Sequence, residues 1–289
     1  MDRQILIEKN FDKDVEIAVY EREGRSLLSF WGIKDRNIAS YSIMEGTSIV
    51  FRFCFRELYE VLCGPNEKMG LHTIIIPSSV REIRNADLPH SICNIINFSP
   101  FFEIENNTLF SANKRDLLRC YDYYNNNGYI IPESVECIRR DAFNGCGFSK
   151  IIIGSSVREM GENPFMNMEH LLGPIIVESC SDYYYTDGYG GIYSNEKELI
   201  AFVGEGDEYH VLDGTTAIQD YAFSGTAVRR IWLPASIKGF NIDKYFPINN
   251  LLFIIPTTLK YDYSSSSLNV VDEITYRNAF KPKKYPGNY

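Results

Sequence analysis

The chain has 289 residues, of which 45% are hydrophobic and 23% are charged, and its formal net charge is −9. These proportions are typical of a soluble folded protein. The acidic balance excludes nucleic acid as an expected partner, because phosphate binding normally needs a basic excess or a clustered basic stripe.

Residues 1–45 precede a series of repeats and do not match the repeat pattern. Alternation of apolar and polar residues from Val15 to Tyr20 predicts strands, and Glu23-Gly24 predicts a turn. We interpret this segment as an N-terminal β cap over the first repeat. Its first nine residues lack the apolar core of a signal peptide, which predicts a cytoplasmic protein. The expectation becomes a surface or secreted protein if the true N-terminus is missing.

Residues 51–62 form the one plausible helix of length, and Gly64-Pro65 ends it. No apolar run in the chain approaches the ~20 residues that a membrane-spanning helix requires. We therefore expect no membrane insertion.

A short phrase recurs along the rest of the chain. An apolar residue and usually Pro are followed by two residues that include Ser or Thr, and then by a second apolar residue. Pro ends an apolar strand because it cannot donate to a ladder, and the hydroxyl side chain can bond to the backbone of a turn. The second and third copies, and the fourth and fifth, lie 22 residues apart, within the roughly 20–29 residues of leucine-rich repeats. The copies begin at Ile76, Ile131, Ile153, Leu233 and Ile255.

A larger unit of about 80 residues occurs twice. Residues 142–160 align with residues 222–240 without a gap, and residues near 101–120 align with those near 184–202. The second pair places a turn-rich stretch between apolar runs, which predicts β-hairpins. The matching apolar positions, such as Phe143, are expected to form one continuous core.

The phrases at residues 131–146 and 213–225 resemble the BspA-type leucine-rich repeat, and the hairpin segments resemble inserts that many bacterial members carry. The resemblance covers roughly residues 46–260. It implies a right-handed solenoid that is mainly β with short helical turns. Residues 261–289 are then a C-terminal cap and tail. Members of this family are mostly associated with protein binding and adhesion, and many are surface proteins of host-associated bacteria.

The reactive side chains form no recognisable active site. The seven cysteines include no pair separated by two residues, and the four histidines are scattered, so we expect no metal site and no cofactor. We interpret the cysteines as small buried hydrophobic residues in a reducing compartment. Cys146 aligns with Thr226 of the second unit, which favours a core thiol over a nucleophile. We assign no catalytic residue.

The first candidate binding feature is the strand that contains Arg230 and Trp232. Alternation sends both side chains to the open side of the sheet if the residue between them points into the core. The repeat aligns Trp232 with Ile152 and Ile75, which predicts one exposed apolar row along the solenoid, flanked by Lys150 and Arg230. Trp and Arg are favoured residues of binding hot spots. The alternative is that another segment of the chain covers this row.

The second candidate is the tyrosine cluster Tyr183-Tyr184-Tyr185, with Tyr189. A ligand role competes with a structural one, because the alignment of Tyr184-Tyr185 with Phe101-Phe102 implies that at least one of the two is structural. Together these features predict a non-catalytic scaffold that binds a protein or a glycan through the face of the solenoid sheet. The alternatives are a structural, self-assembling module and an enzyme with its site in the N-terminal segment.

Overall fold

A computed structural model of the chain describes residues 5–10, 15–21, 26–30, 40–50, 72–84, 88, 92–122, 127–168, 174–178, 180–238, 251–259 and 269–279. The described residues form a β-solenoid that ends in one short helix. The predicted fold class, a mainly β leucine-rich-repeat solenoid with hairpin inserts, is confirmed. The predicted helix at residues 51–62 and the end of the tail, residues 280–289, lie outside the described residues.

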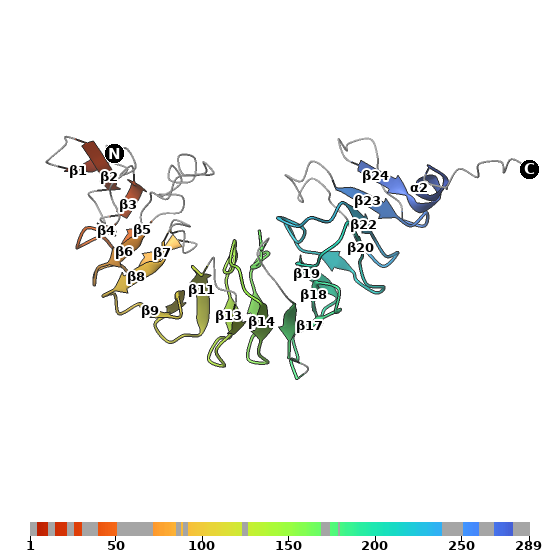
Figure 1. Ribbon diagram of the computed structural model, residues 1–289, viewed down its shortest axis with the longest axis horizontal. Coiled ribbons are helices and arrows are strands. Elements are labelled where there is room, and N and C mark those ends of the chain that lie inside the picture. Colours follow the sequence, from red (N-terminus) through yellow and green to blue (C-terminus); the bar gives the residue numbers. More distant parts are fainter. Residues whose placement is uncertain are drawn as a thin grey trace, which may run out of the picture.

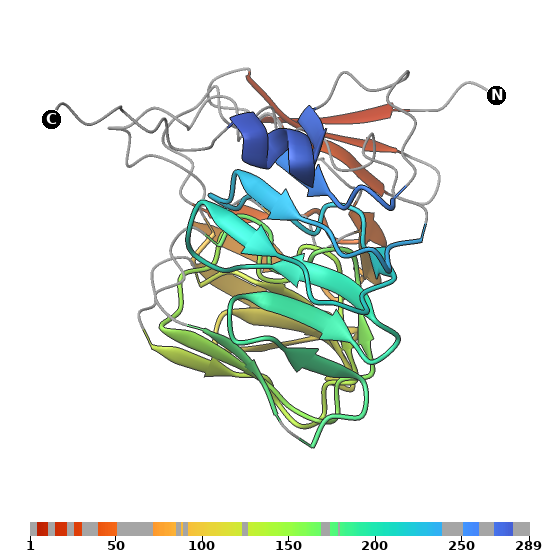
Figure 2. The same cartoon turned by 90° about the vertical axis from the view of Figure 1, so that its right-hand side faces the viewer.

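The coils of the solenoid follow one another around an arch, with β1 at one end and α2 at the other (Figure 1). The chain crosses repeatedly between two walls of strands, so that the space between the walls holds the core. Figure 2 shows the strands of successive coils stacked above one another.

The first wall, called the parallel wall below, consists of three sheets in which every strand pair is parallel. Its sheets are β4 (Ser40–Ser42), β6 (Thr73–Ile76) and β8 (Asn94–Asn97); β12 (Gly128–Ile130), β14 (Lys150–Ile153) and β16 (Ile175–Val177); and β20 (Glu208–His210), β22 (Arg230–Trp232), β23 (Leu252–Ile255) and β24 (Asn269–Asp272). The helix α2 (Glu273–Ala279) follows β24 directly.

The second wall, called the hairpin wall below, also has three sheets, and each begins with three antiparallel strands that continue into parallel ones. Its sheets are β1 (Ile5–Asn10), β2 (Val15–Glu21), β3 (Ser26–Phe30), β5 (Ile49–Val50) and β7 (Glu82–Ile83); β9 (Phe102–Glu105), β10 (Thr108–Ser111), β11 (Asp116–Cys120), β13 (Cys137–Ile138) and β15 (Glu159–Met160); and β17 (Tyr184–Thr186), β18 (Gly191–Ser194), β19 (Glu198–Phe202) and β21 (Ala217–Ile218).

The recurring phrase with Pro forms the turn by which the chain leaves the parallel wall. The N–H of Val135 donates to the carbonyl of Pro132 at 2.9 Å, and Leu259 bonds in the same way to Pro256 at 2.9 Å. Pro suits this position because its ring fixes φ and its carbonyl remains free to accept. The phrase therefore marks the end of each strand of the parallel wall.

Residues 1–45, which the sequence predicts to lie outside the repeat, contain a third copy of the hairpin arrangement. Strands β1, β2 and β3 are antiparallel, and β3 then pairs in parallel with β5. The pairing of β2 with β3 shifts register between Val19 and Tyr20, as the other two copies do at Leu109-Phe110 and Ile192-Tyr193. The copies share main-chain pairing and a β-bulge more than side-chain identity, and the sequence pattern does not reveal such features.

The core between the walls is divided into three clusters, so the prediction of one continuous core is wrong. Leu109 belongs to the first cluster and the adjacent Phe110 to the middle one. Ile192 likewise belongs to the middle cluster and Tyr193 to the last. Because successive side chains of a strand point to opposite faces, β10 and β18 are buried on both faces and stand as partitions between clusters.

The Ala-Phe phrase places an aromatic ring at the centre of the middle cluster. Phe143 is fully buried, stacks on Phe165 with ring centroids 5.4 Å apart, and meets the edge of Tyr129 at 5.5 Å. Its N–H also donates to the carbonyl of Pro164 in the next coil at 2.7 Å. Phe143 therefore joins adjacent coils through both its ring and its backbone.

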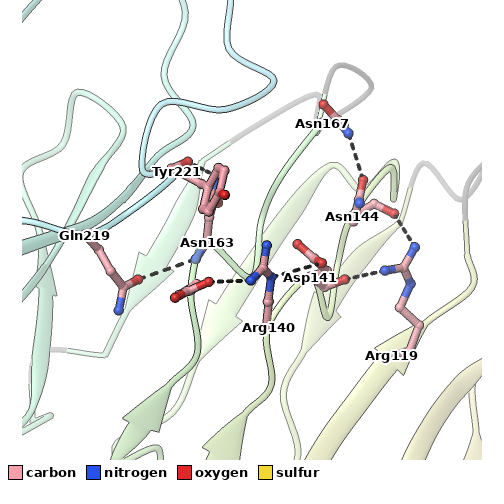
Figure 3. Close-up of polar contacts among 9 residues, drawn as sticks. Arg119, Arg140, Asp141, Asn144, Asn163, Asn167, Gln219 and Tyr221 are labelled. Atoms are coloured by element: carbon pink, nitrogen blue, oxygen red, sulfur yellow. Dashed lines mark hydrogen bonds and ion pairs between the residues drawn. The ribbon is translucent and has the colours of Figure 1, made fainter. Parts of the chain in front are cut away.

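One buried asparagine links two coils across the second hairpin insert. The Asn163 side-chain Nδ2 donates to the carbonyls of Tyr221 at 2.6 Å and Ser224 at 3.4 Å, and its N–H donates to Gln219 Oε1 at 3.4 Å (Figure 3). These partners lie 56 to 61 residues away, because the hairpin is inserted between the two coils. A side chain thus supplies the coil-to-coil bonds that the main chain supplies elsewhere.

Replacing Phe143 with Ala should lower the free energy of unfolding by ~3–5 kcal/mol, because the change leaves a large cavity between coils. Chemical denaturation of the two proteins measures the loss. The matched control is Phe98→Ala, whose ring is 64% exposed, and it should cost no more than about 0.5 kcal/mol. A loss below about 1 kcal/mol for Phe143→Ala would contradict the placement of this ring.

Replacing Asn163 with Ala should destabilise the junction by about 1–3 kcal/mol, because two buried carbonyls lose their donor. Hydrogen exchange should then show residues 202–238 opening before the middle coils, since each coil of a solenoid is held mainly by its neighbours. The control is Asn144→Ala, which removes an exposed contact with Asn167. Uniform exchange across both regions of the Asn163 variant would show that this side chain does not couple them.

Candidate interaction surface

The most exposed apolar row of the parallel wall lies on the middle sheet. In the register of this sheet, Ile130 of β12 is opposite Ile152 of β14, which is opposite Ile176 of β16. Ile130 is 67% exposed and Ile176 is 39% exposed, whereas the flanking Ile151 and Ile153 of β14 are fully buried. We call Ile130, Ile152 and Ile176 the open row. Alternation therefore places Ile152 outward, as predicted.

The three positions that the repeat aligns do not form one continuous row. Ile75 lies outward on β6 beside Ile96, and Trp232 lies outward on β22, but these strands belong to two other sheets. The prediction that Ile75, Ile152 and Trp232 stack along one parallel sheet is therefore wrong. The hairpin inserts add strands to the hairpin wall and none to the parallel wall, so the parallel wall is interrupted twice.

Aromatic side chains extend the exposed apolar surface beyond β8. Phe98 and Phe101 are both exposed, and the Arg81 guanidinium lies over the Phe101 ring at 5.4 Å from its centroid. Apolar and aromatic side chains with an Arg beside them are the types enriched in protein interfaces.

Trp232 is partly covered by the chain itself. Its indole stacks on the His210 ring at 5.1 Å, meets the Tyr276 ring edge-on at 5.4 Å, and lies under the Arg277 guanidinium at 5.6 Å. The indole Nε1 donates to Glu208 Oε1 at 2.6 Å. Tyr276 and Arg277 belong to α2, which contacts β23 and β24. The row of this last sheet therefore carries a helix of the same chain.

The Glu208 carboxylate organises the polar side chains around Trp232. Partial burial acts to raise its pKa, but hydrogen bonds from His210 and Trp232 and the charge of Arg230 hold the pKa below its usual value. Arg230 also bonds to Asp207 at 2.8 Å, so both of its charged contacts lie within the chain. Trp232 and Arg230 therefore both have partners within the chain, and both remain half-buried.

Tyr183, which directly precedes β17, and Tyr184, the first residue of β17, differ in burial. Tyr183 is exposed, but Tyr184 is buried and its hydroxyl donates to the carbonyl of Arg158 at 3.3 Å. Burial raises the pKa of the Tyr184 hydroxyl to about 12. Tyr184 is thus placed as a structural residue, and Tyr185 and Tyr189 join Tyr183 on the exposed side.

A buried chain of hydroxyls fixes the hairpin next to these tyrosines. Tyr209 donates to Asp187 Oδ2 at 2.6 Å, and Tyr193 lies 2.5 Å from the Tyr209 oxygen. Asp187 Oδ1 also accepts from the N–H groups of Tyr189 and Gly191 at 2.8 and 2.9 Å. Its oxygens are therefore used in holding the turn of the hairpin.

A cavity of about 690 Å³ opens beside the open row, between β8 and β12. Asn94 and Ile95 line it from β8, Gly128 and Ile130 from β12, and Asn107 from the turn of the first hairpin. Its size is within the range of small-molecule pockets. The cavity lies where the parallel wall changes from its first sheet to its second.

Sequence reasoning found Ile152 and Lys150 but missed the rest of this surface. Ile130 precedes the phrase at Ile131-Pro132 as Ile152 precedes Ile153-Gly154, so the same alignment could have placed Ile130 outward. Lys150 is exposed at the edge of the open row, next to Gly128. No pattern in the sequence indicates the cavity, because it forms where β8 at the edge of the first sheet faces β12 at the edge of the second.

Neither a metal site nor a membrane span is found among the described residues. No group of three or more His, Cys, Asp or Glu side chains there could hold a metal ion, and no helix there is long and apolar enough to cross a membrane. Cys120, Cys137 and Cys146 are buried as predicted. The same interpretation is wrong for Cys93 and Cys180, which are exposed.

Comparison with known proteins identifies the repeat. Residues 118–186 match a family model whose description is BspA type leucine-rich repeat region (6 copies), which confirms the resemblance seen in the sequence. No curated protein sequence matches the chain.

Among solved structures, a leucine-rich repeat protein from Eubacterium ventriosum has 15% identity and a TM-score of 0.47, covering 89% of this chain and 67% of that one. A leucine-rich cell surface protein from Faecalibacterium prausnitzii has 21% identity and a TM-score of 0.48, covering 75% and 59%. The pneumococcal vaccine antigen PcpA has 14% identity and a TM-score of 0.37, covering 88% and 71%. The chain thus spans 59% of the length of the second of these structures.

Replacing Trp232 with Ala should release α2 from the last sheet, because the ring contacts of Tyr276 and Arg277 are lost. Limited trypsin digestion should then cut after Arg277 at least several times faster, while the rest of the solenoid stays intact. Trp232→Phe is the matched control, since it keeps an aromatic ring and loses only the bond to Glu208. Equal digestion rates for native protein and the Ala variant would mean that Trp232 does not hold the helix.

Proposed function

Because residues 118–186 match the BspA type leucine-rich repeat region, we propose that the chain is a non-catalytic scaffold that binds a protein partner through the open row of its parallel wall. The open row carries this proposal. Three aliphatic side chains, Ile130, Ile152 and Ile176, stand in register on a rigid sheet, and the first is 67% exposed. Contiguous exposed apolar surface on a soluble protein commonly marks an interaction site.

Comparison with the last sheet of the parallel wall favours a protein as the partner. Its equivalent row is covered by protein: Ile254, opposite Trp232 in the register, is only 1% exposed, and α2 contacts its strand. The two sheets share the same repeat geometry, but no described residue covers Ile130 to a similar degree. A segment of another protein would bury the open row as the chain's own residues bury Ile254.

The partner should make its central contact at Ile152, with charged contacts at the edge. Ile152 lies between the other two members of the open row, and the exposed Lys150 lies on the same strand and points to the same side. An apolar centre with a polar rim is the usual anatomy of an interface. In this proposal Trp232 instead holds α2 against the last sheet, and Arg230 bonds to Asp207 and Glu208 beside it.

Replacing Ile152 with Lys should remove the partner while leaving the fold intact, because a charge would be buried in the apolar centre of the interface. The immobilised variant should retain the partner at least tenfold less strongly than the native chain, which corresponds to ~1.4 kcal/mol or more. Quantitative pull-down with thermal melting of the same samples measures both effects. Ile274→Lys, at an exposed position on α2, is the matched control and should retain the partner.

Two results would overturn the proposal. Equal retention of the partner by the native chain and by the Ile152→Lys variant would show that the open row is not part of the binding site. Sedimentation showing a dimer of the chain that Ile152→Lys dissolves would identify the occupant as a second copy, and so favour the self-assembling module.

A further inference from the structure

The cavity beside the open row is bounded by the edges of two sheets. Among the described strands, β8 pairs only with β6 and β12 pairs only with β14, so each has one edge without a strand partner. Residues of both strands line the same cavity. An unpaired strand edge presents a row of N–H and C=O groups, which makes it a template for another strand.

Main-chain pairing shows which groups of β12 face the cavity. The N–H of Ile131 donates to the carbonyl of Ile152 at 3.0 Å, so this residue faces β14. Successive residues of a strand direct their main-chain groups to opposite edges. The N–H and C=O groups of Ile130 and Gly128 therefore point away from β14, toward the side on which both residues line the cavity.

The same alternation applies to β8 on the other side. The N–H groups of Asn94 and Phe98 donate to the carbonyls of His72 at 3.1 Å and Ile76 at 2.8 Å, so both residues face the first sheet. The main-chain groups of Ile95 then point to the opposite edge, and Ile95 also lines the cavity. Two unpaired edges thus border one space.

The first hairpin insert creates this space and closes its end. Strands β9 and β10 join the hairpin wall, and no described strand of the parallel wall lies between β8 and β12. Asn106 and Asn107 form the hairpin turn with φ values of 48° and 53°, and both line the cavity. Tyr129 fixes β12 against this hairpin, because its hydroxyl donates to Thr108 Oγ1 at 3.0 Å.

We propose that the cavity receives an extended segment of a partner protein, which pairs through its main chain with the unpaired edge of β12 and lies beside β8. The segment would occupy the place of the strand that the insert removes from the parallel wall. Main-chain hydrogen bonds give affinity in such strand addition, and pockets for alternate side chains give specificity. The lining suits this ligand, since Ile95 and Ile104 accept apolar side chains and Asn94 and Asn107 offer amide donors and acceptors.

This inference rests on the proposed function, because the same partner would cover the open row next to the cavity. It makes a separate prediction, however, since strand pairing needs the backbone of β12 whereas the open row needs only side chains. Variants of the two features therefore distinguish them.

The test uses a fluorescently labelled peptide with the sequence of residues 148–157. This segment contains β14, which the structure shows pairing in parallel with β12, so its backbone and side-chain alternation suit a β12 edge. Anisotropy titration of the full chain should show saturable binding. The matched peptide, N-methylated at the residues equivalent to Ile151 and Ile152, keeps every side chain but blocks both edges of the peptide strand. It should bind at least tenfold more weakly.

Two variants of the protein locate the site. Ile130→Pro removes an N–H from the open edge of β12 but none from its pairing with β14, and should weaken peptide binding at least tenfold. Ile130→Val keeps that N–H and should bind within about twofold of the native chain. Ile176→Lys changes the open row away from the cavity, so it should release the protein partner yet leave peptide binding unchanged.

Each outcome decides the matter. Absence of peptide binding, equal binding of the N-methylated peptide, or native affinity in a folded Ile130→Pro variant would overturn strand addition. The peptide comparison needs no variant, so it holds even if Ile130→Pro fails to fold. Peptide binding together with failure of the Ile152→Lys test would support the strand site and reject the open row. Displacement of the peptide by an oligosaccharide that binds with equal affinity to Ile130→Pro would identify the cavity as a glycan site instead.

Discussion

The parallel hydrogen-bonded ladder between successive coils is the constraint on which the rest of this structure depends. It sets residues of consecutive coils opposite one another, as with Tyr129, Ile151 and Ile175. Side chains therefore stack in rows, and alternation makes every second row face the core. The same ladder that points Ile151 into the core points Ile130 and Ile152 away from it. The apolar surface of the middle sheet is thus a direct consequence of the repeat.

The hairpin inserts interrupt this ladder, and most features of functional interest occur where they do so. Each insert adds antiparallel strands to the hairpin wall, while the parallel wall continues in a new sheet. Strands β10 and β18 become partitions with both faces buried, so the core divides into three clusters. At the first interruption two strand edges border a cavity, and at the second Asn163 bridges the coils with its side chain. The first insert adds strands that cover the core on the hairpin wall. It adds none to the parallel wall, so the facing edges of β8 and β12 have no strand partner among the described residues.

The middle and last sheets show how one repeat position can have two outcomes. Ile152 and Trp232 are equivalent in the sequence and both point outward. The segment after β23 returns as β24 and α2, and it brings Tyr276 and Arg277 onto Trp232. The middle sheet has no comparable helix among the described residues, so its row stays exposed. Local sequence sets the direction of a side chain, but a distant segment decides whether it remains accessible.

The sequence by itself determined the repeat and its resemblance to the BspA type, the turn at each Pro-containing phrase and the two later hairpins. It also determined the inward or outward direction of residues such as Ile151 and Ile152. These features depend on short-range patterns, namely chain reversal at Pro and side-chain alternation along a strand. Only the tertiary structure decided that Trp232 carries α2, that Tyr184 is buried, that Cys93 is exposed and that residues 1–45 contain a third hairpin. It alone also placed the cavity between β8 and β12. The physical reason is that burial and strand pairing depend on which segments meet in space, and an insert of two strands changes those neighbours without changing the local pattern on either side of it.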